Sequence, residues 1–270
     1  MSNILAFVSI KGGVGKTTLA LETASALAND FDKKVLLVDA NFSAPNIGMY
    51  LDLTKEENRP LTLHHALSGT LLHNVIYEAH GIDVVPASLH HDGEIDVFKL
   101  KKVLEKYKNR YDFIILDSSP NHEELKPVIA AADKIFIVTS PDHVTLNTSM
   151  KAAKLAKEKK TPIEGIIVNR IRNPKHEYDL RAIEKFSKIP VVARIKDHKK
   201  MAQSIYEKTP ITILDRHNPV SREVRNMAAA IAGVSEPRDF LQRIRPFRKA
   251  FNKEGVNRQF LRQRFYESAA

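Results

Sequence analysis

A glycine-rich loop close to the amino terminus holds the residues of this sequence that are best suited to chemistry. Residues 9–18 read S-I-K-G-G-V-G-K-T-T, between an apolar run at 4–8 and a helical pattern at 19–27. Glycines let a backbone curl until several N–H groups point at one anion, the start of a helix adds the positive end of its dipole, and a lysine supplies a mobile charge. The sequence thus predicts a strand, a phosphate-binding loop and a helix. The residues predicted to bind a nucleotide there are Gly12, Gly13, Val14, Gly15, Lys16, Thr17 and Thr18.

Acidic and amide side chains follow two apolar runs that are typical of buried strands. Asp39 and Asn41 follow the second such run of the chain, and Asp117 follows a later one. The carboxyl ends of parallel strands meet at one edge of a sheet, where such folds place their chemistry. Since carboxylates and a threonine hydroxyl suit Mg2+, we expect Thr17, Asp39 and Asp117 to form a metal site beside the loop. A second interpretation of Asp117, as the cap of the next helix, stays open.

Apolar runs alternate with helical patterns along the rest of the chain. Residues 134–139, 165–170 and 189–195 are predicted strands, and two further strands are expected at 74–77 and 82–86. A helix is expected at 97–109. Strands that alternate with helices form a parallel sheet with helices on both faces. The predicted fold class is therefore α/β, a doubly wound, mostly parallel sheet of roughly seven or eight strands, with a helical appendage at the carboxyl terminus.

The composition excludes several kinds of site. The 270-residue chain has no cysteine, so disulfides and cysteine-held zinc or iron–sulfur centres are excluded. It has no apolar run of about 18 residues and enters its first predicted strand at once, so we expect neither a membrane-spanning helix nor a signal peptide. We therefore expect the protein in the cytoplasm. A peripheral position at the inner face of the membrane stays open.

The loop departs from the standard P-loop pattern in a way that resembles one family. Its first glycine position holds Ile10, while an extra lysine, Lys11, precedes Gly12. The form K-G-G-x-G-K-T-T resembles the deviant Walker A loop of the MinD/ParA family of P-loop ATPases, and is closer to MinD within it. The resemblance implies ATP or ADP and Mg2+ as cofactors, with Lys16 on the outer phosphates and Lys11 reaching the nucleotide of a partner subunit in an ATP-bound homodimer. It covers residues 1–233, the predicted ATPase domain, and a plain surface role for Lys11 stays open.

Two further places match the family's pattern to different degrees. Asn169 and Arg170 stand where MinD-like proteins carry the asparagine that hydrogen-bonds adenine, which favours ATP over GTP. Asp39-Ala40-Asn41 stands at the family's D-A-D, whose second aspartate is held to orient the attacking water. Loss of that acid leads us to expect slow hydrolysis, while a role for Asn41 in bracing the next loop stays open. The predicted catalytic residues are Lys11, Lys16, Asp39 and Asn41.

Residues 234–270 are predicted to form a basic amphipathic helical tail. Nine Lys and Arg and four Asp and Glu lie at 236–270, so half of the chain's formal charge of +10 is there. Apolar residues recur at helical spacing, interrupted by Pro246 and Gly255. MinD proteins end in a segment that attaches to membrane when ATP dimerises them, so the resemblance implies an anionic membrane surface as a partner of residues 236–266. Packing on its own domain or on the partner subunit, another protein, and nucleic acid stay open.

The resemblance implies an ATP-dependent dimerisation switch that positions a cellular assembly, with a protein activator as a further partner. A DNA-partition ATPase that binds nucleic acid nonspecifically is the first alternative, and nucleic acid is the less favoured partner. An ATP-binding scaffold with little hydrolysis is the second, motivated by Asn41. Each of these functions requires the same nucleotide site.

Overall fold

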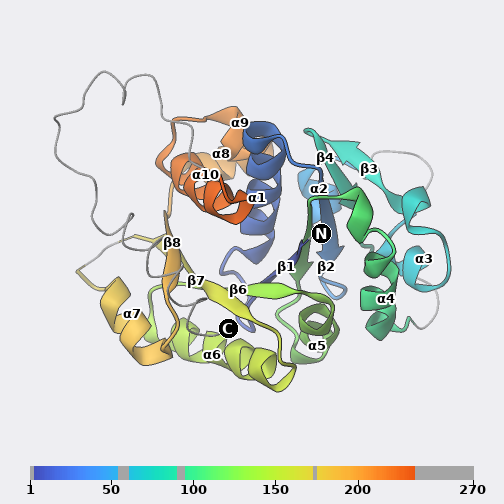
Figure 1. The fold of residues 1–270 in the computed structure, drawn as a ribbon. Coiled ribbons are helices and arrows are strands. Elements are labelled where there is room, and N and C mark those ends of the chain that lie inside the picture. The colour runs from blue at the N-terminus through green and yellow to red at the C-terminus, as the bar shows by residue number, and fades with distance from the viewer. Residues whose placement is uncertain (1–2, 54–60, 90–94, 173–174, 235–270) are drawn as a thin grey trace.

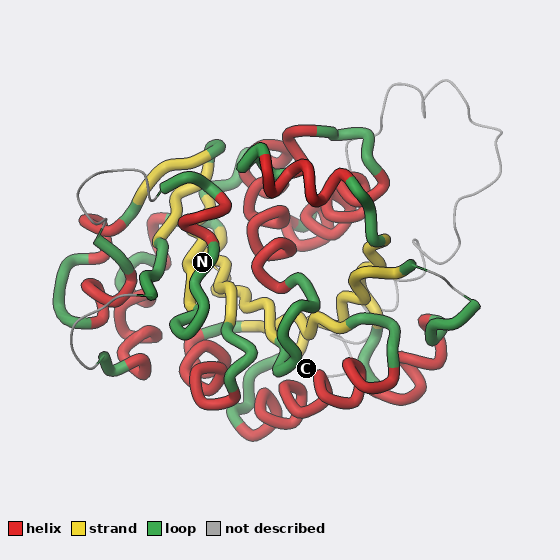
Figure 2. Tube along the Cα trace, turned by 180° about the vertical axis from the view of Figure 1, so that it is seen from behind, coloured by secondary structure: helices red, strands yellow, loops and turns green. Residues whose placement is uncertain are grey.

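The computed structural model describes residues 3–53, 61–89, 95–172 and 175–234. Within them, eight strands form one sheet that is covered by helices on both faces (Figures 1 and 2). The strands are β1 (Asn3–Val8), β2 (Val35–Ala40), β3 (Tyr77–Ala79), β4 (Ile82–Val85), β5 (Phe113–Ser118), β6 (Lys134–Thr139), β7 (Ile163–Ile171) and β8 (Val191–Lys196). The α-helices are α1 (Lys16–Phe31), α2 (Ile47–Tyr50), α3 (Leu63–Leu67), α4 (Leu100–Glu105), α5 (His122–Ala131), α6 (His143–Glu158), α7 (Leu180–Ser187), α8 (Lys200–Tyr206), α9 (Ile211–Leu214) and α10 (Pro219–Ala232). Three 3-10 helices complete the described elements: η1 (Leu72–Val75), η2 (Val97–Lys99) and η3 (Lys108–Arg110).

The order of the strands places the glycine-rich loop in the middle of the sheet. The order is β3-β4-β2-β5-β1-β6-β7-β8, and the described pairs are parallel apart from the antiparallel β3–β4 pair. The predicted α/β fold is thereby confirmed. Strand β1 lies between β5 and β6. Strands β2 to β5 are therefore added on one side of β1, and β6 to β8 on the other. Such a switch point opens a crevice at the carboxyl edge of the strands.

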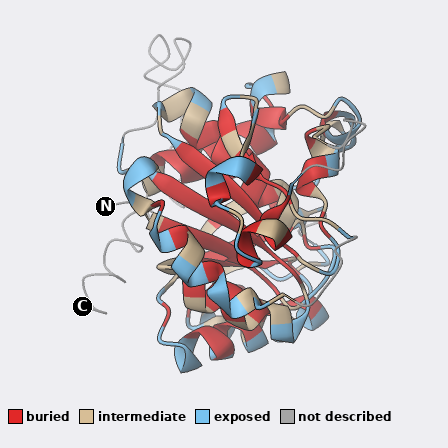
Figure 3. Ribbon diagram, turned by 90° about the vertical axis from the view of Figure 1, so that its right-hand side faces the viewer, coloured by how far each residue is buried: buried red, intermediate tan, exposed pale blue. Residues whose placement is uncertain are grey.

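Alternate residues of β1 belong to two separate cores. Ile4, Ala6 and Val8 face the core shared with α3, α4, α5, α6 and α7, whereas Leu5 and Phe7 face the core shared with α1, α2, α9 and α10. This period-two alternation of apolar side chains is what a strand buried on both faces requires. Figure 3 shows the strands buried through the middle of the molecule, with exposed positions on the outer sides of the helices.

Helix α1, which begins at the loop, is anchored at its other end. Asp30 near its carboxyl end is buried and forms ion pairs with Arg225 of α10, at 3.1 Å between Oδ2 and Nε, and with Arg216. A buried carboxylate that is paired on two sides holds two elements in one register, because leaving it unpaired is costly. The helix that carries the nucleotide loop is therefore fixed to the rest of the fold.

Two sequence expectations about secondary structure are wrong. Residues 74–77 are not one strand: η1 ends at Val75 and the short strand β3 begins at Tyr77. Val75 is fully buried in the core, and the N–H of Asn74 donates to the carbonyl of Leu71 at 3.0 Å, so a turn satisfies the backbone there. The helix expected at 97–109 is α4 alone, with η2 before it and η3 after it.

The predicted boundary between an ATPase domain (1–233) and a tail (234–270) stays a prediction. Helix α10 ends at Ala232, and Gly233 follows it at a φ of 69° as its carboxyl cap. The tail lies outside the described residues, apart from Val234. Among the described helices, none combines the length and the hydropathy that crossing a membrane requires.

Candidate nucleotide and magnesium site

The glycine-rich loop, called the P-loop below (residues 9–18), joins β1 to α1 with its backbone open. Gly13 and Gly15 have φ angles of 78° and 93°, a region that glycine occupies at little cost. Apart from Gly13 and its two neighbours in the chain, no atom of the described residues lies within 4 Å of the place where a Cβ on Gly13 would be. Gly15 is the N-cap of α1 and, as a glycine, makes no side-chain cap hydrogen bond to the first turn. The N–H groups of this turn are therefore available to an anion.

Lys16 is a buried ammonium group with little protein to neutralise it. It is 6% exposed, and its Nζ donates to the Lys11 carbonyl at the long distance of 3.5 Å. Burial lowers the pKa of Lys16, and the nearby Asp117 carboxyl acts in the opposite direction. Additional negative charge would stabilise the ammonium form, so the side chain fits the phosphates of a nucleotide.

Asp39 and Asp117 lie side by side at the carboxyl edge of the sheet. They are register partners on β2 and β5, and both are fully buried. Asp39 accepts backbone N–H groups from Asn41, Asn46 and Ile47, at 3.2, 3.0 and 3.1 Å. Asp117 Oδ2 accepts the Thr17 hydroxyl at 2.6 Å, while its Oδ1 is buried with no hydrogen-bond partner among the described residues. The structure thus brings the three predicted metal residues into one constellation.

The electrostatics of this constellation suit a dication. Burial, and then the facing Asp117 carboxyl, raise the pKa of Asp39, and burial also raises the pKa of Asp117. Two buried carboxyl groups with raised pKa values are stabilised as anions by a cation between or beside them. Thr17, Asp39 and Asp117, all oxygen donors, fit Mg2+. The alternative role of Asp117 as a helix cap is wrong, because Asn121 caps α5 by accepting the N–H of Glu123 at 2.9 Å.

Asn41 combines a bound amide nitrogen with an unpaired amide oxygen. The side chain is 5% exposed, and its Nδ2 donates to the Ala44 carbonyl at 2.5 Å. Its Oδ1 is buried and has no hydrogen-bond partner among the described residues. The nitrogen therefore braces the loop after β2, while the oxygen offers one acceptor. The two roles left open by the sequence are compatible in this geometry.

The loops after β2 and β5 are also joined to each other. Ser43 Oγ lies 3.1 Å from Ser119 Oγ, and the backbone N–H of Ser43 donates to Glu124 Oε2 at 3.1 Å. The sequence does not predict this contact, because nothing in the spacing of two serines 76 residues apart indicates that they touch. A movement of one loop would therefore have to break or carry along its contacts with the other.

Comparison with known proteins decides the family. A family model described as an AAA domain matches residues 2–163. An uncharacterised ATP-binding protein of Methanocaldococcus jannaschii is 30% identical over 238 residues, which cover 86% of this chain and 89% of that one. The septum site-determining protein MinD of Bacillus subtilis is 27% identical over 255 residues, covering 90% and 93%. The chain belongs to the MinD/ParA family of P-loop ATPases.

A solved member of the MinD/ParA family has the same fold. The MinD protein of Pyrococcus horikoshii, in complex with Mg-ADP, superposes with a TM-score of 0.79 at 24% identity, over 86% of this chain and 96% of that chain. ATP and Mg2+ are the cofactors of this family, and the protein is an ATPase of it. In this fold the P-loop residues would hold the phosphates, and Thr17, Asp39 and Asp117 would hold the metal ion.

The two residues that MinD/ParA resemblance places at the base differ in their surroundings. Asn169 is 9% exposed, and its Nδ2 donates to the Val14 carbonyl of the P-loop at 2.7 Å. Arg170 is exposed, with a φ of 58°. Asn169 is therefore part of the loop's scaffold, and its contact with adenine stays a prediction, as does that of Arg170. Near the end of β7, Arg172 forms an ion pair with Asp197 at 2.6 Å.

Lys11, the lysine that marks the MinD/ParA loop, differs from Lys16 in its exposure and in the contacts of its side chain. It is exposed, whereas Lys16 is buried. Its backbone N–H donates to Ser9 Oγ at 3.2 Å, which fixes the peptide. Its side chain forms no hydrogen bond or ion pair with the residues that the structure describes. The peptide is anchored while the ammonium group is left to solvent.

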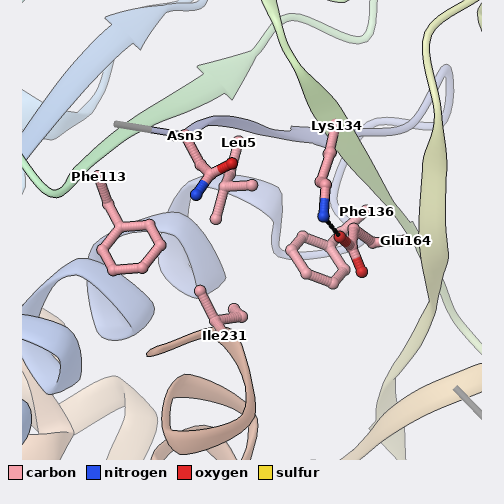
Figure 4. Close-up of a pocket in the computed structure, with 7 residues that line it drawn as sticks. All are labelled: Asn3, Leu5, Phe113, Lys134, Phe136, Glu164 and Ile231. Carbon is pink, nitrogen blue, oxygen red and sulfur yellow. Dashed lines mark ion pairs between the residues drawn. The ribbon is translucent and has the colours of Figure 1, made fainter. Parts of the chain in front are cut away.

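A separate cavity of about 50 Å3 lies at the opposite edge of the sheet (Figure 4). It is lined by Asn3, Leu5, Phe113, Lys134, Phe136, Glu164 and Ile231. Lys134 and Glu164 form an ion pair at 2.6 Å on its wall. The space is of the order of a few water molecules, so it does not compete with the P-loop as a nucleotide site.

Proposed function

We propose that this chain is an ATP-dependent dimerisation switch, in which Lys11 of each subunit completes the nucleotide site of the other. The observation that carries the proposal is the division of labour between two lysines of one loop. Lys16 is buried within its own site, whereas Lys11 is exposed beside it on an anchored peptide. An exposed lysine held at the rim of a phosphate site is placed to meet the negative charge of a nucleotide bound by a second copy.

The residues of the chain divide the work of hydrolysis in this proposal. Backbone N–H groups of the P-loop and Lys16 bind and orient the phosphates, and Thr17, Asp39 and Asp117 hold Mg2+, which supplies positive charge there. Asn41 Oδ1 accepts a hydrogen bond from the attacking water. An amide oxygen is a weaker acceptor than a carboxylate, so we expect turnover of about one per minute or slower.

Sedimentation velocity of the full chain tests the switch. With Mg-ATP the chain should sediment as a dimer, and with Mg-ADP or without nucleotide as a monomer. Lys11→Ala should stay monomeric with ATP but bind ADP as the unchanged chain does. Lys154→Ala, which removes an exposed lysine of α6, is the matched control and should still dimerise. A chain that stays monomeric with Mg-ATP would overturn the proposal.

We also propose a cytoplasmic protein that attaches peripherally to the inner face of an anionic membrane through residues 236–266. The support is the basic apolar pattern of that segment, since a few apolar anchors with several basic residues bind weakly and two copies in a dimer add avidity. Liposomes that contain phosphatidylglycerol should pellet the chain with Mg-ATP, and neutral liposomes should not. Phe247→Asp should abolish pelleting while leaving the dimer intact. Pelleting without nucleotide would contradict a switch.

One observation favours the alternative of a nucleic-acid-binding partition ATPase. Lys151, Lys154 and Lys157 are exposed along one side of α6, in addition to Lys199. A basic helix face binds phosphate backbones in a manner that weakens steeply with salt. DNA binding that requires ATP and disappears between low and moderate salt, together with no pelleting by liposomes, would favour this alternative. A protein activator would raise turnover in either case.

A further inference from the structure

Two fully buried serines connect the P-loop to helix α6. Ser9 and Ser149 are both 0% exposed, and their Oγ atoms lie 3.2 Å apart. Ser9 Oγ accepts the backbone N–H of Lys11 at 3.2 Å. Ser149 Oγ lies 3.3 Å from the carbonyl of Val138 on β6. Three hydrogen bonds therefore run from Lys11, through two hydroxyl groups, to the strand beside β1.

Counting the hydroxyl hydrogens fixes the direction of each hydrogen bond in this series. A carbonyl oxygen only accepts, so Ser149 must donate its single hydroxyl hydrogen to Val138. Ser149 can then only accept from Ser9, and the Ser9 hydrogen must be the donor. Ser9 receives the Lys11 N–H at the same oxygen. Each hydroxyl thus donates once and accepts once, and the removal of either serine leaves buried groups without a partner.

Ser149 places a hydroxyl group on the buried face of α6. The buried residues that follow it in the helix are apolar, namely Ala152, Ala153, Leu155 and Ala156, whereas Thr145, one turn before it, is also buried and polar. An apolar side chain at 149 would complete that face without a hydroxyl to satisfy. Buried hydroxyl groups that are fully paired specify one arrangement of the elements that they join. Here they join α6 and β6 to the peptide of Lys11.

The hydrogen bond between Ser9 and the Lys11 N–H can persist when a nucleotide is bound. The other described contact of the Lys11 backbone involves its carbonyl, which accepts from Lys16 Nζ at 3.5 Å. Lys16 is also the residue proposed to bind the outer phosphates, so that contact weakens when a nucleotide is bound. The Lys11 N–H then depends on Ser9, and Ser9 on Ser149.

We infer that Ser149 is a positioning residue for Lys11, acting through Ser9; this rests on the role of Lys11 given under the proposed function. Ser149 fixes the Lys11 peptide, and the peptide determines where the exposed ammonium group can reach in the other subunit. Loss of the Ser149 hydroxyl lets the peptide shift. Small displacements of a charge that acts at the reacting phosphates lower the rate strongly, whereas binding of the nucleotide within one subunit does not depend on Lys11.

Full-length variants with matched burial test the inference. Ser149→Ala and Ser9→Ala each remove one of the two hydroxyl groups in this series of hydrogen bonds, and the double variant removes both. Thr161→Val is the control, because the Thr161 hydroxyl is also buried and donates to the Ile129 carbonyl at 3.0 Å, outside the P-loop. The measurements are kcat and KM for Mg-ATP, the Kd of ADP, the thermal midpoint, and amide hydrogen exchange at Lys11.

Ser149→Ala should lower kcat about tenfold, leave the Kd of ADP within about twofold, and speed amide exchange at Lys11. The double variant should be no slower than the poorer single variant, because both substitutions break the same series of hydrogen bonds. Thr161→Val should lose a similar amount of thermal stability with kcat and Lys11 exchange unchanged. Ser149→Cys, which keeps the size and a weak donor, should lie between Ser149→Ala and the unchanged chain.

Two outcomes would overturn the inference: kcat of Ser149→Ala or Ser149→Cys that matches Thr161→Val, or unchanged Lys11 exchange in these variants. The proposed function fails in a different way, through an unchanged chain that does not dimerise with Mg-ATP. In that case the exchange of the Lys11 amide still reports whether Ser149 holds the loop.

Discussion

The side-chain amide of Asn169 donates to the backbone carbonyl of Val14 at 2.7 Å, across 155 residues of sequence. This bond fixes the orientation of the amide, since its nitrogen must face the P-loop. Oδ1 is then left as an acceptor, beside the second hydrogen of the amide nitrogen. Adenine offers an amino group to such an acceptor where guanine has a carbonyl, so we expect the fixed amide to favour an adenine nucleotide.

Asn169→Asp tests this relationship. The carboxylate has the same shape but cannot donate to Val14, so we expect ADP binding to weaken by about 1–2 kcal/mol and the preference for ADP over GDP to fall. Isothermal titration with both nucleotides measures both effects. Asn109→Asp makes the same change at an exposed position and should bind as the unchanged chain does. Equal affinities of Asn169→Asp and Asn109→Asp would show that the Val14 bond does not matter to the site.

Gly15 is constrained by backbone and neighbour together. Its φ is 93°, and a Cβ there would lie 2.4 Å from Asn169 Nδ2. Gly15→Ala should therefore cost about 1–3 kcal/mol of stability and more than tenfold in ADP affinity. Gly69→Ala separates the two causes, because Gly69 has a φ of 120° but no described residue beyond its two neighbours comes within 4 Å of its Cβ position. Thermal unfolding and ADP titration should show instability in both variants and lost binding in Gly15→Ala alone. Retained binding in Gly15→Ala would refute the close approach.

Asn41 and Asn46 offer a matched pair for the hydrolysis step. Both donate Nδ2 to the Ala44 carbonyl, at 2.5 and 2.8 Å, but only Asn41 is buried with an unpaired Oδ1. Asn41→Asp places the stronger acceptor where Oδ1 is, so the single-turnover rate of ATP hydrolysis should rise several-fold or more. Asn46→Asp loses the same kind of bond and should leave the rate within about twofold. A rate of Asn41→Asp that matches Asn46→Asp would mean that Asn41 does not limit hydrolysis.

Glu22 makes the stability of α1 depend on pH. It is 1% exposed, and it accepts the backbone N–H groups of Ile211 and Thr212, at 2.8 and 3.1 Å, and the Thr212 hydroxyl at 2.9 Å. Burial raises the pKa of Glu22 from 4.5 to about 7 against these hydrogen bonds, which lower it. The folded chain therefore keeps a proton that the unfolded chain has released between these two values.

The sign follows from that proton. The contribution of Glu22 to the free energy of unfolding is full below pH 4.5, declines as the pH rises, and is lost above about 7. The loss is on the order of 3 kcal/mol. Glu22→Gln does not titrate, so the stability of the unchanged chain relative to Glu22→Gln should fall between pH 5 and pH 8 in urea unfolding. A difference that stays constant over this range would contradict the raised pKa.

Local pattern was sufficient to predict the elements that carry the site. The P-loop, the polar ends of β2 and β5 and the mostly parallel sheet follow from apolar runs and glycine spacing, which act over a few residues. The failures are non-local. Val75 is drawn into the core and its backbone turns before β3, although its sequence suits a strand. The contacts Asn169–Val14, Ser43–Ser119 and Ser9–Ser149 depend on side-chain directions that only the packed fold determines.

The central claim is that Lys11 acts in the other subunit, and mixing two inactive chains tests it most directly. Lys11→Ala keeps Lys16 and its own phosphate site, while Lys16→Ala keeps Lys11. In a mixed dimer the intact site of the Lys11→Ala chain receives Lys11 from the Lys16→Ala chain. The account predicts that the mixture regains ATP turnover that neither chain has alone. Turnover of the mixture that equals the sum of the two separate chains would contradict it.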